Sequence, residues 1–251
     1  MNFKDKVVLI TGAGAGIGRT TAIMFAEKGA KVVVADRSQK GLETVDMIKK
    51  AGCEAIFVQG DISVASDAEN MVKEAVKTFG RLDILVNNAG IVLGGRIDDT
   101  TEEDFDKTMS VNVKGTFLVS KYAVLEMKKT GGGVIVNVGS IAGLKGITNR
   151  CAYSASKGAV ISLTRAMAID LIKDNIRVNC VCPGTTYTQG LAERINAAPD
   201  PDAMLAEFVS RQPIGRLGKE EEIAFAILFA CCDEAAFMNG SIITIDGGAT
   251  I

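Results

Sequence analysis

Histidine is absent from all 251 residues of the sequence. Without imidazole, the chain cannot form a Ser-His-Asp hydrolase triad, a Cys-His protease pair or a histidine-ligated metal site. We therefore expect no metal centre. A general base that works near neutral pH must instead be a carboxylate, a lysine, a cysteine or a tyrosine.

Other features that mark whole classes of protein are also missing. The net charge is −2, and no basic cluster occurs, which argues against nucleic-acid binding through phosphate neutralisation. No apolar run approaches the roughly 20 residues that cross a bilayer. The N-terminus, MNFKDKVVLITG, lacks the apolar core of a signal peptide. These absences favour a soluble, cytoplasmic protein.

The six cysteines form no Cys-x-x-Cys motif. They are Cys53, Cys151, Cys180, Cys182, Cys231 and Cys232. We expect them to be small buried hydrophobic residues in a reducing compartment.

Apolar segments typical of strands alternate with helical patterns along the whole chain. Continuous apolar runs are expected when helices cover both faces of a parallel sheet. Seven such strands joined by helical crossovers predict an α/β fold with one doubly wound parallel sheet in a single domain, residues 1–251. The predicted strands lie near residues 6–12, 31–36, 55–61, 82–90, 133–140, 176–184 and 241–248. A long helical region is predicted at about 102–128.

One segment interrupts this rhythm. More than 30 residues, at about 184–217, separate the sixth strand from the last helix. An insert of that length inside a compact domain is usually functional. We predict a partly helical lid over the site.

The first strand leads into TGAGAGIG, in which Gly12, Gly16 and Gly18 give the spacing G-x-x-x-G-x-G. Glycines let a pyrophosphate approach the free N–H groups at a helix N-terminus. Asp36 ends the next strand, 20 residues after Gly16. A carboxylate there can accept the ribose hydroxyls of an adenosine and repels a 2′-phosphate. This pattern predicts a dinucleotide site.

Together with NNAG, SVNVKG, YSASK, PGTTYT and DGG, this turn resembles the short-chain dehydrogenase/reductase family over essentially the whole chain. The resemblance implies a Rossmann-type fold. It places Asp61 at the adenine, NNAG against the cofactor and Thr188 at the nicotinamide carboxamide. Ala15 stands where many NADP-dependent relatives carry a basic residue, which favours NAD, whereas Arg37 could tolerate a phosphate. The expected cofactor residues are Gly12, Gly16, Ile17, Gly18, Asp36, Arg37, Asp61, Ile62, Asn88, Ala89, Gly90, Tyr153, Lys157, Pro183, Gly184, Thr186 and Thr188.

YSASK places Tyr153 and Lys157 at i and i+4, on one helix face. A phenol is a poor base at neutral pH, and an ammonium one turn away favours its phenolate form. By resemblance, Tyr153 is the general acid/base and Lys157 holds the ribose. Ser140 positions the substrate oxygen, and Asn112 holds a water in the proton relay. The implied reaction moves a hydride between a secondary alcohol and the nicotinamide.

Several segments are most similar to the branch with cytosolic (R)-3-hydroxybutyrate dehydrogenase and dehydrogenases of 2-keto-3-deoxy sugar acids. That branch holds a carboxylate with arginines that match Arg150, Arg194 and Arg211. Guanidinium is the usual bidentate partner of a carboxylate. Tyr187 departs from the small or acidic residue common there, which leaves the identity of the acid open.

Two other functions stay open on the sequence. A 3-oxoacyl-thioester reductase or a polyol dehydrogenase would not need the arginines. A non-catalytic NAD-binding regulator usually lacks the tyrosine or the lysine, and this chain has both. The resemblance also implies a homotetramer, and the apolar helix EEIAFAILFACC and the last strand are candidate interfaces.

Overall fold

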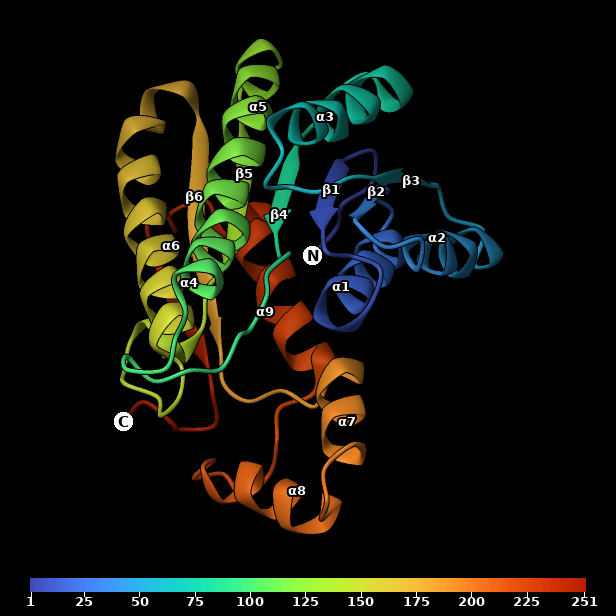
Figure 1. Ribbon diagram of the computed structural model, residues 1–251. Coiled ribbons are helices and arrows are strands. Elements are labelled where there is room, and N and C mark those ends of the chain that lie inside the picture. The colour runs from blue at the N-terminus through green and yellow to red at the C-terminus, as the bar shows by residue number, and fades with distance from the viewer.

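Seven parallel strands form one sheet at the centre of the computed structural model, which describes residues 1–251 (Figure 1). The strand order is β3-β2-β1-β4-β5-β6-β7. This order confirms the predicted doubly wound sheet. The strands are β1 Val7–Thr11, β2 Lys31–Asp36, β3 Ala55–Gln59, β4 Ile84–Asn87, β5 Gly133–Val138, β6 Ile176–Pro183 and β7 Ile242–Ile245.

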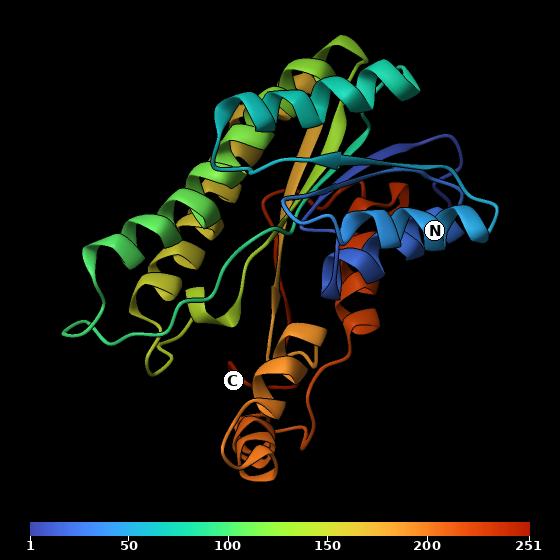
Figure 2. The same cartoon turned by 45° about the vertical axis from the view of Figure 1, so that its right-hand side comes forward.

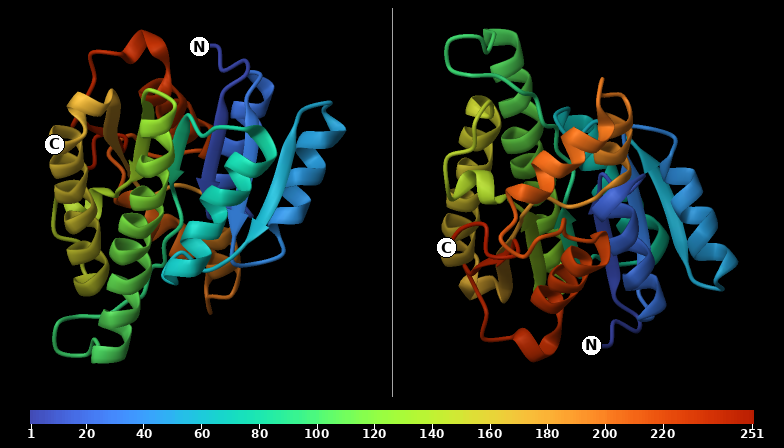
Figure 3. Two further views of the ribbon diagram at one scale, coloured as in Figure 1. Left: turned by 90° about the horizontal axis from the view of Figure 1, so that it is seen from above. Right: turned by 90° about the horizontal axis from the view of Figure 1, so that it is seen from below.

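Helices cover both faces of this sheet, as the views from above and from below show (Figure 3). Successive residues of one strand supply both cores. Val8 and Ile10 of β1 pack with the first helix layer, whereas Val7 and Leu9 pack with the second. The first layer contains α1 Gly16–Glu27, α2 Gly41–Lys50 and α9 Glu220–Cys231. The second contains α3 Ala65–Phe79, α5 Thr116–Lys129 and α6 Cys151–Asp170.

The insert projects beyond the carboxyl ends of the strands (Figure 2). It contains two helices, α7 Gln189–Asn196 and α8 Pro201–Ser210. Its two ends are joined at the base, because Tyr187 N–H donates to the Gly218 carbonyl at 2.9 Å and Gly218 N–H donates to the Thr185 carbonyl at 3.0 Å. We call the insert, residues 184–217, the flap, and its base, where Thr185 and Tyr187 bond to Gly218, the neck. The flap is the segment predicted as a lid.

The predicted helix at 102–128 is interrupted. Helix α4, Glu102–Met109, passes into a π-helical turn at Ser110–Gly115 before α5 begins. Hydrophobic periodicity does not distinguish a π turn from an α-helix, so this interruption was not visible in the sequence. Such turns are frequent at functional sites.

All six cysteines are free, and four of them, Cys180, Cys182, Cys231 and Cys232, are buried. Cys53 and Cys151 are partly exposed. None of the helices has the length and apolar character needed to cross a membrane.

Candidate functional site

A cleft of about 490 Å³ runs along the carboxyl ends of β1, β2, β3 and β4. It collects most of the predicted cofactor residues. They are Gly12, Gly16, Ile17, Gly18, Asp36, Arg37, Asp61, Ile62, Asn88, Ala89, Gly90 and Thr188. The lining also includes residues that were not predicted as contacts: Ala15, Ala35, Gly60, Met71, Ile91, Val92, Val111 and Gly190.

The glycines of the first turn are required by close backbone packing. Gly12 has φ +65°, and a Cβ there would lie 2.8 Å from Cα of Ala89. A Cβ at Gly18 would lie 2.3 Å from the Gly12 carbonyl oxygen. Gly16 has φ +58° and begins α1. Because no side chain fills the turn, the N-terminus of α1 stays open to a phosphate group.

Asp36 is held in a fixed orientation at the end of β2. Its Oδ2 accepts the Gly14 N–H at 2.9 Å, and its Oδ1 accepts the Ser38 N–H at 2.8 Å. The two bonds fix the direction in which the carboxylate points. The carboxylate therefore lines the cleft as a fixed negative charge.

Asp61 and Arg37 both line the cleft and form an ion pair, with 3.8 Å between Nη1 and Oδ2. Burial alone would raise the pKa of Asp61. The Ser63 hydroxyl and N–H, at 2.7 and 2.9 Å, together with the Arg37 charge, hold that pKa below its ordinary value. The charge of Arg37 is thus shared with a carboxylate.

Tyr153 and Lys157 lie one turn apart on α6, as their spacing predicted. Lys157 Nζ is 5.8 Å from the centroid of the Tyr153 ring and donates to the Val138 carbonyl at 2.7 Å. Lys157 is buried, with 5% of its surface exposed. The end of β5 therefore fixes the ammonium beside the phenol.

Asn112 sits in the π-helical turn with 1% of its surface exposed. Its side-chain amide forms a two-way pair with the backbone of Ile91: Oδ1 accepts the N–H at 2.8 Å, and Nδ2 donates to the carbonyl at 3.0 Å. Nδ2 also donates to Ser156 Oγ at 3.0 Å. The turn thus aims Asn112 at the loop that follows NNAG.

Gly90, Asn112 and Lys157 converge on one point. A Cβ at Gly90 would lie 3.1 Å from Asn112 Oδ1 and 3.5 Å from Lys157 Nζ. Gly90 also lines the cleft at the ends of β1 to β4. Three segments far apart in the sequence therefore meet at the end of that cleft.

Ser140 follows β5 and is 9% exposed, and its Oγ accepts the Ala142 N–H at 3.1 Å. The hydroxyl proton remains available to another acceptor. Ser156 was missed by sequence reasoning. It is fully buried and links Asn112 to the Tyr153 carbonyl, to which its Oγ donates at 2.7 Å. Its position within YSASK was the only available signal.

Five predicted cofactor residues do not line this cleft: Tyr153, Lys157, Pro183, Gly184 and Thr186. Pro183 ends β6, and Gly184 lines a different cavity. Thr186 is buried at the neck of the insert and donates to the Gly184 carbonyl at 3.2 Å. Thr188 does line the cleft, and its Oγ1 caps α7 by accepting the Leu191 N–H at 3.2 Å.

The three predicted arginines form one positively charged region. Burial lowers the pKa of Arg150, and the positive charges of Arg194 and Arg211 lower it further, whereas Tyr153 acts in the opposite direction. Arg194 and Arg211 both lie over the ring of Phe208, at 5.7 and 5.3 Å from its centroid. Arg150, which directly precedes α6, is therefore near enough to Tyr153 and to the two arginines of the insert to be influenced by their charges.

Arg211 is already paired within the flap, because its guanidinium contacts the Glu207 carboxylate one turn away. The same guanidinium is the one expected from the sequence to bind a carboxylate ligand. No salt bridge occupies Arg150 or Arg194.

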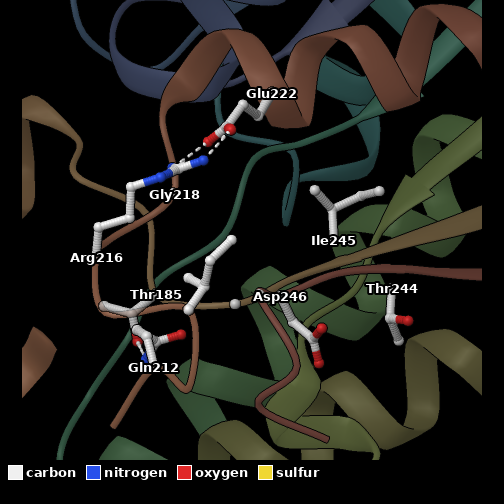
Figure 4. Close-up of a pocket in the computed structure, with 11 residues that line it drawn as sticks. Thr185, Gln212, Arg216, Gly218, Glu222, Thr244, Ile245 and Asp246 are labelled. Atoms are coloured by element: carbon white, nitrogen blue, oxygen red, sulfur yellow. Dashed lines mark hydrogen bonds and ion pairs between the residues drawn. The ribbon is translucent and has the colours of Figure 1, made fainter. Parts of the chain in front are cut away.

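A second cavity, of about 300 Å³, lies at the neck of the insert (Figure 4). Arg216 and Glu222 close one end of it through two charge-assisted bonds of 2.6 and 2.9 Å. Hydrogen bonds from Arg216 and from the Lys219 N–H lower the pKa of Glu222 to about 2. Gln212 donates to Thr185 Oγ1 at 3.0 Å across the neck. The Gln212–Thr185 bond joins the two ends of the insert, whereas the Arg216–Glu222 pair ties its C-terminal end to α9.

A family model described as enoyl-(acyl carrier protein) reductase matches residues 12–250. The chain belongs to the short-chain dehydrogenase/reductase family. The match spans the glycine turn, the Tyr-Lys pair and the flap, and the members of this family are oxidoreductases.

Relatives within the family cover nearly the whole chain. An uncharacterized oxidoreductase of Thermotoga maritima is 65% identical over 251 residues, covering 100% of this chain and 99% of the relative. The 2-(S)-hydroxypropyl-CoM dehydrogenase 3 of Xanthobacter autotrophicus is 41% identical, covering 98% and 97%. The crystal structure of an NAD+-bound xylitol dehydrogenase superposes with a TM-score of 0.93 at 33% identity, covering 99% and 100%.

Proposed function

We propose that this protein is an NAD(H)-dependent dehydrogenase that interconverts a secondary alcohol and its ketone. The convergence of Gly90, Asn112 and Lys157 carries the proposal, because it joins the dinucleotide cleft to the Tyr153 helix. The glycine turn fits a dinucleotide, since Gly12, Gly16 and Gly18 line the cleft where the N-terminus of α1 begins. The nicotinamide, when bound, accepts or returns the hydride.

The residues of the chain supply orientation and proton transfer. Tyr153 Oη takes the alcohol proton during oxidation and returns it during reduction. Lys157, fixed by the Val138 carbonyl, stabilises the negative charge that forms on the phenol. Ser140 Oγ donates to the substrate oxygen. Asn112 ties the loop after NNAG to the catalytic helix through Ser156, and we assign it the water of the proton relay.

NAD rather than NADP is the proposed cofactor. Asp36 presents a fixed carboxylate where a 2′-phosphate would lie, and like charges held close together repel. Arg37 does not offset this repulsion, because its guanidinium faces Asp61. The structural relative with NAD+ bound supports the same choice.

The proposed substrate is a small hydroxy acid or its keto form. Arg150 and Arg194 carry no partner carboxylate, and together with Arg211 they place positive charge between the catalytic helix and the flap. This charge, together with the similarity of several segments to the hydroxybutyrate and sugar-acid branch, supports the acid. The alternative substrate is a neutral polyol. It is favoured by the pairing of Arg211 with Glu207 and by the similarity of the chain to a xylitol dehydrogenase.

An absorbance assay for NADH formation tests both the dehydrogenase activity and the preference for a hydroxy acid. Purified protein is given NAD and matched pairs of secondary alcohols, each pair consisting of a hydroxy acid and its neutral amide. Turnover of the acid with little turnover of the amide supports the full proposal. Preference for neutral alcohols contradicts the acid assignment, and no turnover of any alcohol or ketone contradicts the dehydrogenase itself.

We further propose that four chains assemble into a homotetramer in the cytoplasm. Helix α9 exposes Phe225 and Phe229, and α5 exposes Phe117 and Leu125. Aromatic side chains that project from two different helix faces are typical of association surfaces. The buried thiols suit a reducing compartment.

A further inference from the structure

Glu220, the first residue of α9, bonds to the helix that begins at the glycine turn. Its Oε2 accepts the hydroxyl of Thr20, on α1, at 2.7 Å. This is the only hydrogen bond of the Glu220 carboxylate, and no lysine or arginine forms a salt bridge with it. The side chain is only partly exposed. It is therefore a fixed carboxylate without a cation.

The same carboxylate borders the open side of the glycine turn. A Cβ built on Gly16 would lie 3.8 Å from Glu220 Oε1 and 3.7 Å from Thr188 Cβ. Gly16 and Thr188 both line the dinucleotide cleft. Glu220 thus lies just behind these two lining residues, at the N-terminus of α1, where a pyrophosphate would bind.

No cation of the chain balances this charge inside the cleft. Arg37 is the only lysine or arginine that lines it, and Arg37 faces Asp61. Arg19 follows the glycine turn, but its guanidinium pairs with Glu43 at 3.0 Å and donates to the Gly14 carbonyl. A pyrophosphate at the glycine turn would therefore meet no cation that is free of a carboxylate partner, and it would lie close to a carboxylate that repels it.

We infer that Glu220 limits the affinity for the dinucleotide and speeds its release. This inference rests on the proposed function, because it requires that NAD(H) binds at the glycine turn. Release of the product or cofactor limits turnover in many enzymes. A carboxylate near the pyrophosphate shortens the lifetime of the complex, and the Thr20 hydroxyl keeps that carboxylate in position. Glu220 is thus a residue that tunes affinity, and it does not touch the reacting atoms.

A purely structural role for Glu220 makes different predictions. If Glu220 only ties α9 to α1, removing either partner of the hydrogen bond should weaken the turn and lower NADH affinity. If its charge matters, Glu220→Gln should raise affinity, because the amide oxygen still accepts from Thr20 while the charge is gone. Thr20→Val should not reproduce that gain, since the charge remains.

The test measures NADH dissociation constants by fluorescence titration and release rates by stopped flow, at an ionic strength of about 10 mM, where screening is weak. We expect Glu220→Gln to bind NADH about three- to tenfold more tightly, with a release rate lower by a similar factor, and the gain to shrink at about 0.5 M salt. Glu221→Gln is the matched control. It removes the same charge from the next residue of the helix, which is exposed, and should change affinity less than about twofold.

Three results would overturn the inference. One is a Glu220→Gln enzyme that binds NADH as the parent does or more weakly. Another is an equal gain in Glu221→Gln, which would mean a long-range charge effect. If Glu220→Gln is poorly folded by thermal melting, Glu220→Ser is compared with Thr20→Val, since both lose the hydrogen bond and only Glu220→Ser loses the charge. A parent protein that fails to bind NADH at all refutes the proposed function, and this inference with it.

Discussion

The carboxylate of Asp36 accepts the backbone N–H of Gly14, with 2.9 Å between the nitrogen and Oδ2. Strand β2 and the glycine turn are thereby joined through the residue that we expect to select the cofactor. Since the Ser38 N–H occupies the other oxygen, at 2.8 Å, the carboxylate cannot easily turn away from a larger ligand.

This arrangement predicts a strong preference for NAD. We expect kcat/KM for NAD to exceed that for NADP by at least about a hundredfold, because a 2′-phosphate would be pushed against a fixed carboxylate. Asp36→Ser should reduce the ratio by about tenfold or more. Steady-state kinetics with both cofactors provide the measurement. Equal values in the parent, or a preference for NADP, would contradict the role of Asp36 and point to Arg37 as a phosphate ligand.

The positively charged region predicts how the substrate is selected. Replacing Arg194 or Arg211 with Met should lower kcat/KM for a hydroxy acid by about tenfold to a hundredfold, because a charge-assisted pair of roughly 1.5–3 kcal/mol is lost. The kcat/KM for a neutral alcohol of the same size should fall much less.

Flap damage would impair both substrates alike, so the ratio is the informative quantity. Glu207→Gln is a useful companion variant, since it frees Arg211 from its partner within α8. It should raise kcat/KM for the hydroxy acid if Arg211 binds the carboxylate of the substrate. Equal losses for acid and alcohol in the arginine variants would favour the polyol or thioester alternatives.

The ion pair at the neck of the flap predicts a specific pH dependence of stability. The pKa of Glu222 is about 2 in the folded chain, against 4.5 as its ordinary value. Because the folded pKa is lowered, the pair stabilises the fold fully above about pH 4.5. That stabilisation is lost progressively as the pH falls towards about 2.

Glu222→Gln should therefore lower the urea midpoint slightly at pH 7, and the difference from the parent should shrink between about pH 5 and pH 3. Solvent screens this exposed pair, so the difference is small at every pH. A difference that is constant with pH would show that the carboxylate charge does not stabilise the neck.

The exposed aromatic residues of α9 predict assembly. Light scattering should give about four times the chain mass of 26.4 kDa. Phe225→Glu should reduce that mass, because it places a charge in a candidate interface. Ile97→Glu, at a residue that is 82% exposed in a loop away from α9, is the control and should leave the mass unchanged. A monomeric parent at micromolar concentration would refute the tetramer.

The sequence predicted the fold well because its signals are local and repeated. Apolar runs such as VVLIT and KVVVAD mark buried strands, and each is followed by a helical pattern, so a parallel sheet follows. The glycine turn and Asp36 were predictable for the same reason. Their spacing within one strand-helix-strand unit is enough to place them together.

The rest depends on contacts between distant segments, which no local pattern encodes. The π-helical turn around Asn112 has the hydrophobic spacing of an ordinary helix. Ser156 acquires a role only when α6 meets that turn, and Glu220 only when α9 packs on α1. The pairing of Arg211 with Glu207 is different, because its i, i+4 spacing is local and was readable in the sequence.

The central claim is that Tyr153 is the general acid/base. It is tested most directly by measuring turnover and NADH binding of Tyr153→Phe side by side. The phenylalanine ring keeps the packing beside Lys157 but cannot exchange a proton. We predict that kcat falls by about 10²–10⁴-fold while the dissociation constant of NADH stays within about twofold of the parent. A variant whose activity lies within about tenfold of the parent would contradict the assignment of Tyr153 as the general acid/base.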